Sequence, residues 1–300
     1  MTWQARLLTT ALRYIEKRHL ARAEDPIRLR QSFERKARVI FRSPQGTRSR
    51  WVALGAAWAL ELTGPWVRPG APILYIHGGA FVMGSPMTHK AMLARLSQRS
   101  GRRVLMVQYP LAPEHSFPAA FDTCLSAYRA CAADGPFILG GDSAGGNLAL
   151  SVLGHAIAEG LPSPIGAFAF SPLTDLTFSG DSLVSNEKAD PLLPASRALD
   201  TATYYLNGAP ADTPRASPLL ADWAGAPPLW LAVDETEILL DDTLRLQAKV
   251  VAAGGAVTLH QTNGLPHVWP MFHNYIPEAR STLNVLARWI THLSAAPDES

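Results

Sequence analysis

The chain has 300 residues, of which 47% are hydrophobic and 17% charged, and its formal net charge is +2. This length and a mean hydropathy near zero predict one large globular domain, or a domain with an inserted or appended cap. No apolar stretch approaches the ~18 uncharged residues of an integral membrane span, and no known module supports a nucleic-acid partner.

The N-terminal segment carries most of the positive charge. Residues 1–50 contain 13 Lys or Arg and four Asp or Glu, which gives a net charge of +9. The rest of the chain contains 14 Lys or Arg and 21 Asp or Glu, which gives a net charge of −7. A basic amphipathic helix either docks against its own acidic body, the commoner arrangement, or lies on an anionic membrane surface. Charges interrupt the first 20 residues and no small-residue cleavage site follows, so we expect no signal peptide. The apolar residues at helical spacing are Trp3, Leu7, Leu8, Leu12 and Ile15.

From about residue 50, apolar runs alternate with helical patterns, which predicts an α/β fold with a mostly parallel sheet flanked by helices. The first two strands are separated only by Gly55-Ala56-Ala57 and should form an antiparallel hairpin. Helices are expected at about 87–99 and 118–132, from about residue 146, and after each of the last two strands. Eight strands are expected, at 51–54, 58–62, 73–76, 104–108, 138–140, 165–170, 229–233 and 257–261.

A proline-rich segment between Ser171 and Pro228 breaks this alternation and is too long for a plain connection. It follows a strand at the sheet edge where open sheets bind their ligands, so it predicts a lid or cap. We expect a cap insertion at 176–221, a core formed by 49–175 and 222–300, and N-terminal helices at 1–48 that contribute to the cap.

The two cysteines, Cys124 and Cys131, lie on one predicted helix. Their separation along its axis is about 10 Å, which is too far for a disulfide. A reducing, cytoplasmic location is consistent with this cysteine usage.

Gly141-Asp142-Ser143-Ala144-Gly145 joins an apolar strand to a helix. Glycines two residues on either side of Ser143 permit a sharp, strained turn that lifts the hydroxyl clear of the sheet. An ordinary glycine-rich loop would need neither a basic partner nor oxyanion donors elsewhere, and this chain offers both. The pattern therefore predicts that Ser143 is a nucleophile.

A serine nucleophile needs an imidazole to take its proton and a carboxylate to orient that imidazole. Among nine histidines, His267 is the best placed, in a turn-rich loop just after the last strand, and His273 is its main competitor.

The acid should follow the seventh strand, where residues 233–242 offer five carboxylates. Asp241 and Asp242 have the position of first-turn helix residues, where a carboxylate favours the helix dipole. Asp234, Glu235 and Glu237 remain as loop candidates, and the chemistry of the side chains does not choose among them.

The segment His77-Gly78-Gly79-Ala80-Phe81 directly follows the third predicted strand. Small residues there let backbone amides approach a substrate, and each such donor typically contributes about 3 kcal/mol to stabilising an oxyanion. Ala144, next to the nucleophile, should supply a further amide. His77 itself is expected to be structural, with a hydrogen bond to the loop.

Together these segments closely resemble the bacterial hormone-sensitive-lipase-like (family IV) carboxylesterases, which have the α/β-hydrolase fold. The resemblance covers roughly residues 70–275. By the family pattern, D-x-L-x-D-[DE] begins at the catalytic acid, which implies Glu237, and H-x-W in the last loop implies His267. The other matching segments are His77–Ala80, Tyr109–His115, Phe117–Ala120, Gly141–Asn147, Ser171–Leu176 and Asp190–Leu192.

The chain departs from this family pattern at four positions. Ala80 replaces the third oxyanion glycine, Glu237 replaces the usual aspartate, Asp234 replaces a glycine near the acid, and Pro110 replaces the usual arginine after Tyr109. None of these changes removes a needed functional group.

The resemblance implies a serine carboxylesterase that hydrolyses small-molecule esters with short acyl groups through an acyl-enzyme. Ser143, His267 and Glu237 would form the triad, and the oxyanion hole would consist of the amides of Gly79, Ala80 and Ala144, with Gly78 shaping the loop. No cofactor or metal is expected. A lactone hydrolase with the same triad is the alternative, followed by a non-catalytic ligand receptor on a hydrolase scaffold. The oligomeric state, monomer or homodimer, stays open.

Overall fold

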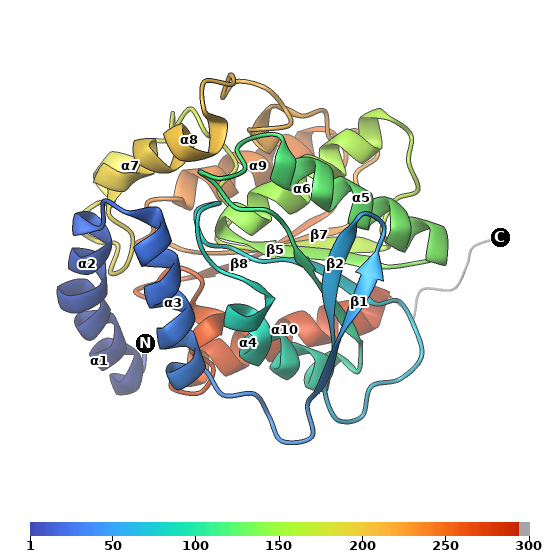
Figure 1. The fold of residues 1–300 in the computed structure, drawn as a ribbon, viewed down its shortest axis with the longest axis horizontal. Coiled ribbons are helices and arrows are strands. Elements are labelled where there is room, and N and C mark those ends of the chain that lie inside the picture. The colour runs from blue at the N-terminus through green and yellow to red at the C-terminus, as the bar shows by residue number, and fades with distance from the viewer. Residues whose placement is uncertain (294–300) are drawn as a thin grey trace.

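A computed structural model describes residues 1–293, so the last part of the expected core segment 222–300 lies outside the described residues. Its centre is one eight-stranded sheet in the order β1-β2-β4-β3-β5-β6-β7-β8 (Figure 1). The β1–β2 and β2–β4 pairs are antiparallel and the others are parallel, in agreement with the predicted hairpin and mostly parallel sheet. The strands are β1 Arg48–Leu54, β2 Ala57–Thr63, β3 Ile73–Ile76, β4 Val104–Gln108, β5 Ile138–Asp142, β6 Gly166–Phe170, β7 Leu229–Asp234 and β8 Val257–Thr262.

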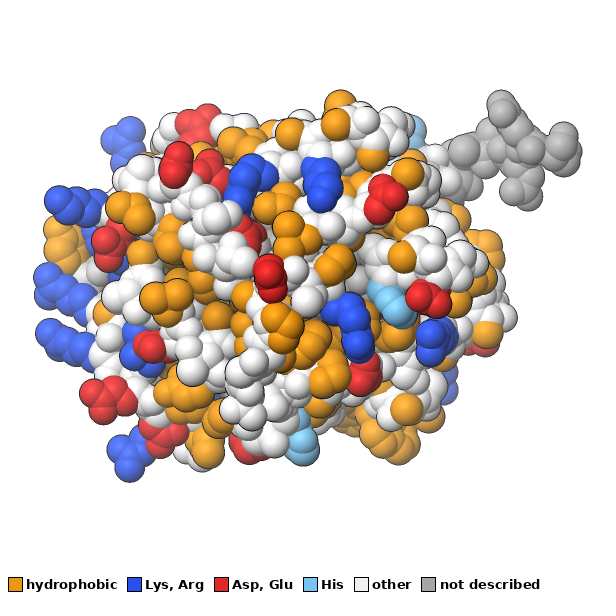
Figure 2. Space-filling model, turned by 90° about the horizontal axis from the view of Figure 1, so that it is seen from above, with side chains coloured by type: hydrophobic (Ala, Val, Ile, Leu, Met, Phe, Trp, Pro, Cys, Tyr) orange, Lys and Arg blue, Asp and Glu red, His pale blue; other side chains and the backbone are white. Residues whose placement is uncertain are grey.

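The N-terminal segment is helical: α1 Trp3–Ala11, the π-helical turn Leu12–Glu16 and α2 Lys17–Arg22 form an N-terminal arm (residues 1–22), which α3 Pro26–Ile40 follows. The insertion contributes α7 Ser182–Ser185, α8 Ala198–Leu206 and the short 3₁₀ turns Ala195–Arg197 and Pro218–Leu220. The two segments lie side by side at one end of the molecule (Figure 1). Lys and Arg side chains project from this end (Figure 2).

The N-terminal arm docks on the body as expected, but mostly through carbonyl oxygens. Arg13 Nη2 donates to Ala189 O at 2.8 Å, and Lys17 Nζ donates to Asp190 O at 2.9 Å. The arm therefore packs against the insertion without neutralising most of its own positive charge. Within residues 1–293, no helix is both long and apolar enough for a bilayer crossing.

Two hydrophobic clusters cover the two faces of the sheet. Alternate residues of β3 separate between them: Leu74 and Ile76 face one cluster, Ile73 and Tyr75 the other. The first cluster lies beneath α5 Ala119–Asp134, α6 Ser143–Ala158 and α9 Leu240–Ala252. The second lies beneath α4 Pro86–Ser100 and α10 Pro277–Leu293.

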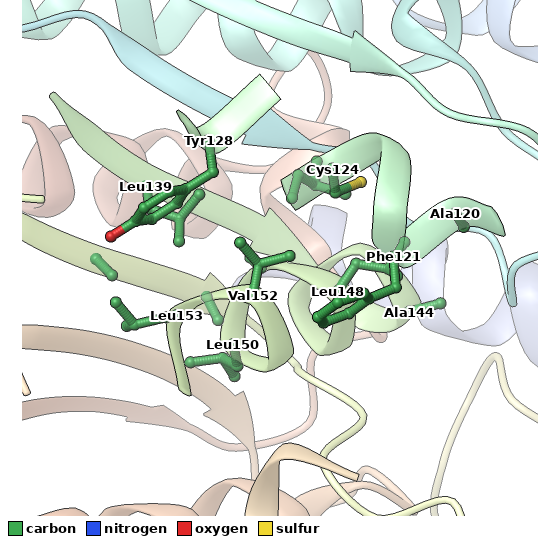
Figure 3. Close-up of a cluster of buried hydrophobic side chains, with 14 of the residues drawn as sticks. Ala120, Phe121, Cys124, Tyr128, Leu139, Ala144, Leu148, Leu150, Val152 and Leu153 are labelled. Atoms are coloured by element: carbon green, nitrogen blue, oxygen red, sulfur yellow. The ribbon is translucent and has the colours of Figure 1, made fainter. Parts of the chain in front are cut away.

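Tight packing between α5 and α6 holds the start of α6 in place. Phe121 and Cys124 of α5 gather against Leu148 and Val152 of α6 (Figure 3). Full burial of each large apolar side chain contributes about 1.5–3 kcal/mol. Cys124 and Cys131 are both free and buried within α5.

Candidate active site

Ser143 is the first residue of α6, directly after the last residue of β5. The prediction that the helix begins near Gly146 is wrong, because Gly145 and Gly146 belong to its first turn. A side chain on Gly145 would place Cβ 2.2 Å from His77 O. Glycine is therefore needed here because the helix packs closely against the backbone of His77, and not because the chain forms a loop. Ser143 has φ 53°, a conformation that costs an L-residue roughly 1–2 kcal/mol and that turns its side chain out of the sheet.

Asp142, which precedes the serine, ties the end of β5 to neighbouring elements. Its buried carboxylate accepts hydrogen bonds from Tyr75 Oη (2.7 Å), the Gly78 amide (3.0 Å) and His89 Nε2 (3.2 Å). Burial opposes the charged carboxylate, but His89 and the hydrogen bonds from Tyr75 and the Gly78 amide together outweigh burial and lower the pKa of Asp142. Sequence reasoning missed this network, although an aspartate at the end of a buried strand requires partners.

The loop after β3 presents backbone amides beside Ser143. The amide of Gly78 is engaged by Asp142, whereas those of Gly79 and Ala80 have no acceptor within the described chain. Gly79 has φ 126° and a Cβ there would lie 2.2 Å from Met83 O, so only glycine fits. Ala80 takes φ 54° despite its methyl group. The Ala144 amide lies in the first turn of α6, where N–H groups have no intrahelical acceptor.

His77 supports this loop. Its Nδ1 lies 2.9 Å from Gly78 O, and its ring stacks on Tyr109 at 4.3 Å between centroids. Burial lowers the pKa of His77 to about 3, so the ring is neutral and its Nδ1–H donates to the carbonyl oxygen. Tyr109 Oη in turn donates to His77 O at 2.7 Å.

His267 lies in the loop after β8, and its Nδ1 is 2.5 Å from Glu237 Oε2. Its Nε2 is buried and has no hydrogen-bond partner among residues 1–293. Ser143 and His267 line the same cavity. Burial disfavours the imidazolium, but the carboxylate and hydrogen bond of Glu237, together with the carboxylates of Asp190 and Asp142, outweigh that effect and raise the pKa of His267.

Glu237 is completely buried, and both of its carboxylate oxygens are bonded. Oε1 accepts from Ser171 Oγ at 2.7 Å and from the Asp234 amide at 2.9 Å, which leaves Oε2 for the histidine. Ser171 Oγ also accepts from the Val268 amide at 3.3 Å. The Ser171 hydroxyl therefore bridges Glu237 and the residue that follows His267, and both Ser171 (φ 47°) and Val268 (φ 50°) are strained.

The carboxylate of Asp234 serves the histidine loop and not the imidazole. It accepts five hydrogen bonds: from the amides of Thr236 (3.0 Å), Gly264 (2.9 Å) and Leu265 (2.8 Å), and from the hydroxyls of Thr236 (2.6 Å) and Thr262 (2.8 Å). Two of those amides precede His267 by two or three residues. Asp234 thus fixes the path of the loop that carries the histidine.

The other carboxylates and the other histidine that the sequence offered for these roles, all of them among residues 1–293, do not bond His267. Glu235 is exposed and accepts from Asn263 Nδ2 at 2.5 Å. Asp241 and Asp242 occupy the first turn of α9, as predicted. His273 is buried, which lowers its pKa to about 4, and its Nδ1 has no partner in the described part of the chain. Within the described residues, Glu237 is thus the one loop candidate that bonds His267.

Two apolar cavities, of about 130 and 190 Å³, meet at Ser143. The first is completed by the insertion, through Phe178, Pro194 and Tyr204. The second is completed by the N-terminal helices and by His267. The residues that line both are Leu20, Leu29, Ala80, Met83, Ser143 and Leu193.

The insertion also holds the loop that carries Glu237. Asp190 Oδ2 accepts from the Ile238 amide at 3.0 Å, and Asn186 Nδ2 donates to Glu237 O at 2.9 Å. Because Lys17 bonds the carbonyl of Asp190, the arm, the insertion and the loop of Glu237 form one connected unit.

Comparisons with known proteins agree with this architecture. Residues 73–271 match the family described as alpha/beta hydrolase fold. The chain is 35% identical over 236 residues to an acetyl-hydrolase of Streptomyces hygroscopicus, across 76% of this chain and 79% of that protein. It is 38% identical over 227 residues to an esterase of Acinetobacter venetianus, across 74% of this chain and 75% of that protein.

Solved structures agree over nearly the whole length. The crystal structure of EstE5 soaked with ethyl alcohol has a TM-score of 0.92 and 34% identity, and the match covers 99% of this chain and 100% of that one. An esterase from the bacterial hormone-sensitive lipase family has a TM-score of 0.92 and 31% identity, with 98% and 99% covered. The chain therefore belongs to the hormone-sensitive-lipase-like (family IV) esterases of the α/β-hydrolase fold, and it is a carboxylic ester hydrolase.

Proposed function

We propose that the chain hydrolyses short-chain acyl esters through an acyl-enzyme on Ser143, with His267 as general base and acid and Glu237 as the group that orients it. One observation carries this proposal. His267 Nδ1 is fixed by Glu237, while its Nε2 is unpartnered within residues 1–293 and the histidine lines the cavity that Ser143 also lines. In unliganded sites the bond between serine and histidine is often long and tightens only with substrate.

In the acylation step, His267 Nε2 takes the proton of Ser143 as Oγ attacks the ester carbonyl carbon. The carbonyl oxygen becomes an oxyanion and accepts hydrogen bonds from the amides of Gly79, Ala80 and Ala144. As the intermediate collapses, the C–O bond to the alcohol breaks and His267 donates its proton to the leaving oxygen. In the deacylation step, water attacks the acyl carbon while His267 Nε2 takes its proton. The bond from the acyl carbon to Ser143 Oγ then breaks, His267 returns the proton to Oγ, and the carboxylic acid product is released.

Glu237 supports both steps through electrostatics. When His267 is protonated, the carboxylate at 2.5 Å from Nδ1 stabilises the imidazolium in a buried environment, where charge interactions are strong. The raised pKa of His267 has the same physical cause, namely the neighbouring carboxylate acting against burial.

We also propose that the N-terminal helices (1–48) and the insertion (176–221) together form the cap of a core comprising 49–175 and 222–300. The two cavities would accept the acyl and alcohol groups on either side of the scissile bond. Their modest volumes and the Ala80 methyl group favour short chains. Crystals of the similar protein EstE5 were soaked with p-nitrophenyl butyrate, a short-chain ester, and this choice of ligand is consistent with the substrate class proposed here.

The test is a panel of p-nitrophenyl esters of increasing acyl length, with lactones assayed in parallel. We expect the highest kcat/KM for short acyl chains, labelling of the enzyme by a fluorophosphonate, and loss of both turnover and labelling in Ser143→Ala. Faster turnover of lactones would move the substrate class to cyclic esters. Absence of both turnover and labelling in the intact protein would refute the proposed catalytic role of Ser143.

A further inference from the structure

The outer face of the N-terminal arm is unusually apolar. Four large hydrophobic side chains project into solvent: Trp3 is 66% exposed, Leu7 62%, Tyr14 57% and Ile15 69%. Their spacing along α1 and the π-helical turn places them on one side of the arm. A surface helix of a globular protein normally presents polar residues to water on that side.

The same face is basic. Arg6, Arg18 and Arg22 are exposed and, within residues 1–293, have no carboxylate partner. The Arg18 guanidinium lies over the Tyr14 ring, 5.4 Å from its centroid. Glu16 is the single acidic residue among residues 1–22, and it is paired with Lys36 at 2.7 Å. The outer face therefore combines apolar anchors with uncompensated positive charge.

The inner face of the arm already has its partners. Ala5 is fully buried, Leu12 and Leu20 line the cavities at Ser143, and the Thr2 amide donates to Glu278 at 2.5 Å. Arg13 and Lys17 bond carbonyl oxygens of the insertion. The arm is thus held in place by one face, whereas the apolar side chains opposite are mostly exposed to solvent.

We propose that this outer face, formed by Trp3, Arg6, Leu7, Tyr14, Ile15, Arg18 and Arg22, binds an anionic phospholipid surface. The charge favours this occupant, since each Lys or Arg near an anionic membrane contributes about 1 kcal/mol. The side chains fit it as well: tryptophan and tyrosine are enriched at the interface between lipid and water, and arginine pairs with phosphate. Figure 2 shows hydrophobic side chains between the Lys and Arg that project from this end.

Docking in this way would bring the catalytic cavities to the lipid surface, because the opposite face of the same helices lines them. An apolar ester dissolved in the membrane would then have a short path to Ser143. The surface itself is independent of the proposed triad, so each proposal can fail without the other.

The experiment is cosedimentation of the full-length protein with vesicles of phosphatidylcholine alone and of phosphatidylcholine mixed with phosphatidylglycerol. We expect binding to the anionic vesicles that weakens as salt is raised. Arg6→Gln/Arg18→Gln/Arg22→Gln should lower the partition coefficient on the order of 100-fold, as expected for three such cations. Trp3→Gln/Leu7→Gln/Ile15→Gln should lower it by at least about 10-fold, since the apolar anchors are lost.

Matched controls change exposed residues elsewhere. Trp51→Gln/Trp58→Gln removes two tryptophans that are 46% and 60% exposed on β1 and β2. Arg99→Gln/Arg129→Gln/Arg288→Gln removes three exposed charges outside the arm. All variants should keep wild-type turnover of soluble p-nitrophenyl acetate, which reports that the site is intact.

Three outcomes would overturn the proposal: no binding of the wild-type protein to anionic vesicles at low salt, equal binding by the arm variants, or equal losses in the controls. Gel filtration provides a further test. If the apolar triple variant converted a dimer into a monomer, the face would be covered by a second copy of the chain and not by lipid.

Discussion

Replacement of Glu237 by glutamine is the most direct test of the proposed triad. Oε1 accepts from two donors, Ser171 Oγ and the Asp234 amide, so the carbonyl oxygen of the new carboxamide must take that place. The NH₂ group then points at His267 Nδ1 and donates to it. The imidazole is forced to carry its proton on Nε2, where it has no lone pair with which to accept the proton of Ser143.

The expected magnitude follows from this change of tautomer. Wrong-tautomer substitutions in serine triads cost up to about 10⁴ in kcat, and we expect a loss of roughly 10³–10⁴ here, equivalent to about 4 to 5 kcal/mol of barrier. The variant should fold, because the carbonyl oxygen keeps both of its donors and one N–H of the carboxamide donates to His267 Nδ1. The assay is kcat with saturating p-nitrophenyl acetate, together with thermal unfolding to exclude a structural loss.

Asp234→Asn is the matched control. Its carboxylate receives five donors, so an amide NH₂ must face at least one of them. We expect a loss of about 1–3 kcal/mol in the free energy of unfolding, with a much smaller effect on kcat than in the Glu237 variant. The opposite ranking of the two kcat values would refute the assignment of Glu237 and transfer the acid role to Asp234.

Three further predictions concern the same site. His267 must be neutral to act as base, and its pKa is raised by Glu237, so activity should fall on acidification with an apparent pKa above the ordinary value of about 6.5. An acidic limb of the pH–activity profile centred well below that value would contradict the role of His267. Ser171→Ala removes one hydrogen bond to a buried carboxylate, worth about 1.5–3 kcal/mol, so kcat should fall roughly 10- to 100-fold with KM nearly unchanged; unchanged kcat would show that Ser171 does not position Glu237. Ala80→Gly removes a methyl group that lines both cavities, so kcat/KM for p-nitrophenyl isobutyrate should rise relative to the butyrate ester. Glycine also relieves the backbone strain at φ 54°, about 1 kcal/mol, and this gain should offset the greater conformational entropy of the unfolded chain. The free energy of unfolding, measured by thermal denaturation, should therefore stay nearly unchanged.

Much of the fold could be predicted because it depends on local pattern. The buried strands β3, β5, β6 and β7 are short apolar runs between helical patterns, and they form the predicted parallel sheet. The antiparallel hairpin β1–β2 was equally visible from its short glycine-containing connection. These features need no knowledge of distant contacts.

What escaped prediction depends on contacts through space. Gly145 and Gly146 resemble a loop in sequence, yet they are helical, because Gly145 packs directly on the backbone after β3. The bond from Ser171 to Glu237 joins residues 66 positions apart, and that from His89 to Asp142 joins residues 53 apart. Side-chain type alone indicates that such buried groups need partners but does not identify them.

The two departures from the family pattern near the proposed acid, Glu237 and Asp234, are compatible because they act on different parts of the site. Glu237 is one methylene longer than aspartate, and its carboxylate is held in place by Ser171 and by the Asp234 amide. The Asp234 side chain points instead to the amides of Gly264 and Leu265, which lead to His267. The Asp234 backbone thus holds Glu237, and the Asp234 side chain holds the loop that leads to His267, so this second carboxylate does not compete with Glu237 for the imidazole.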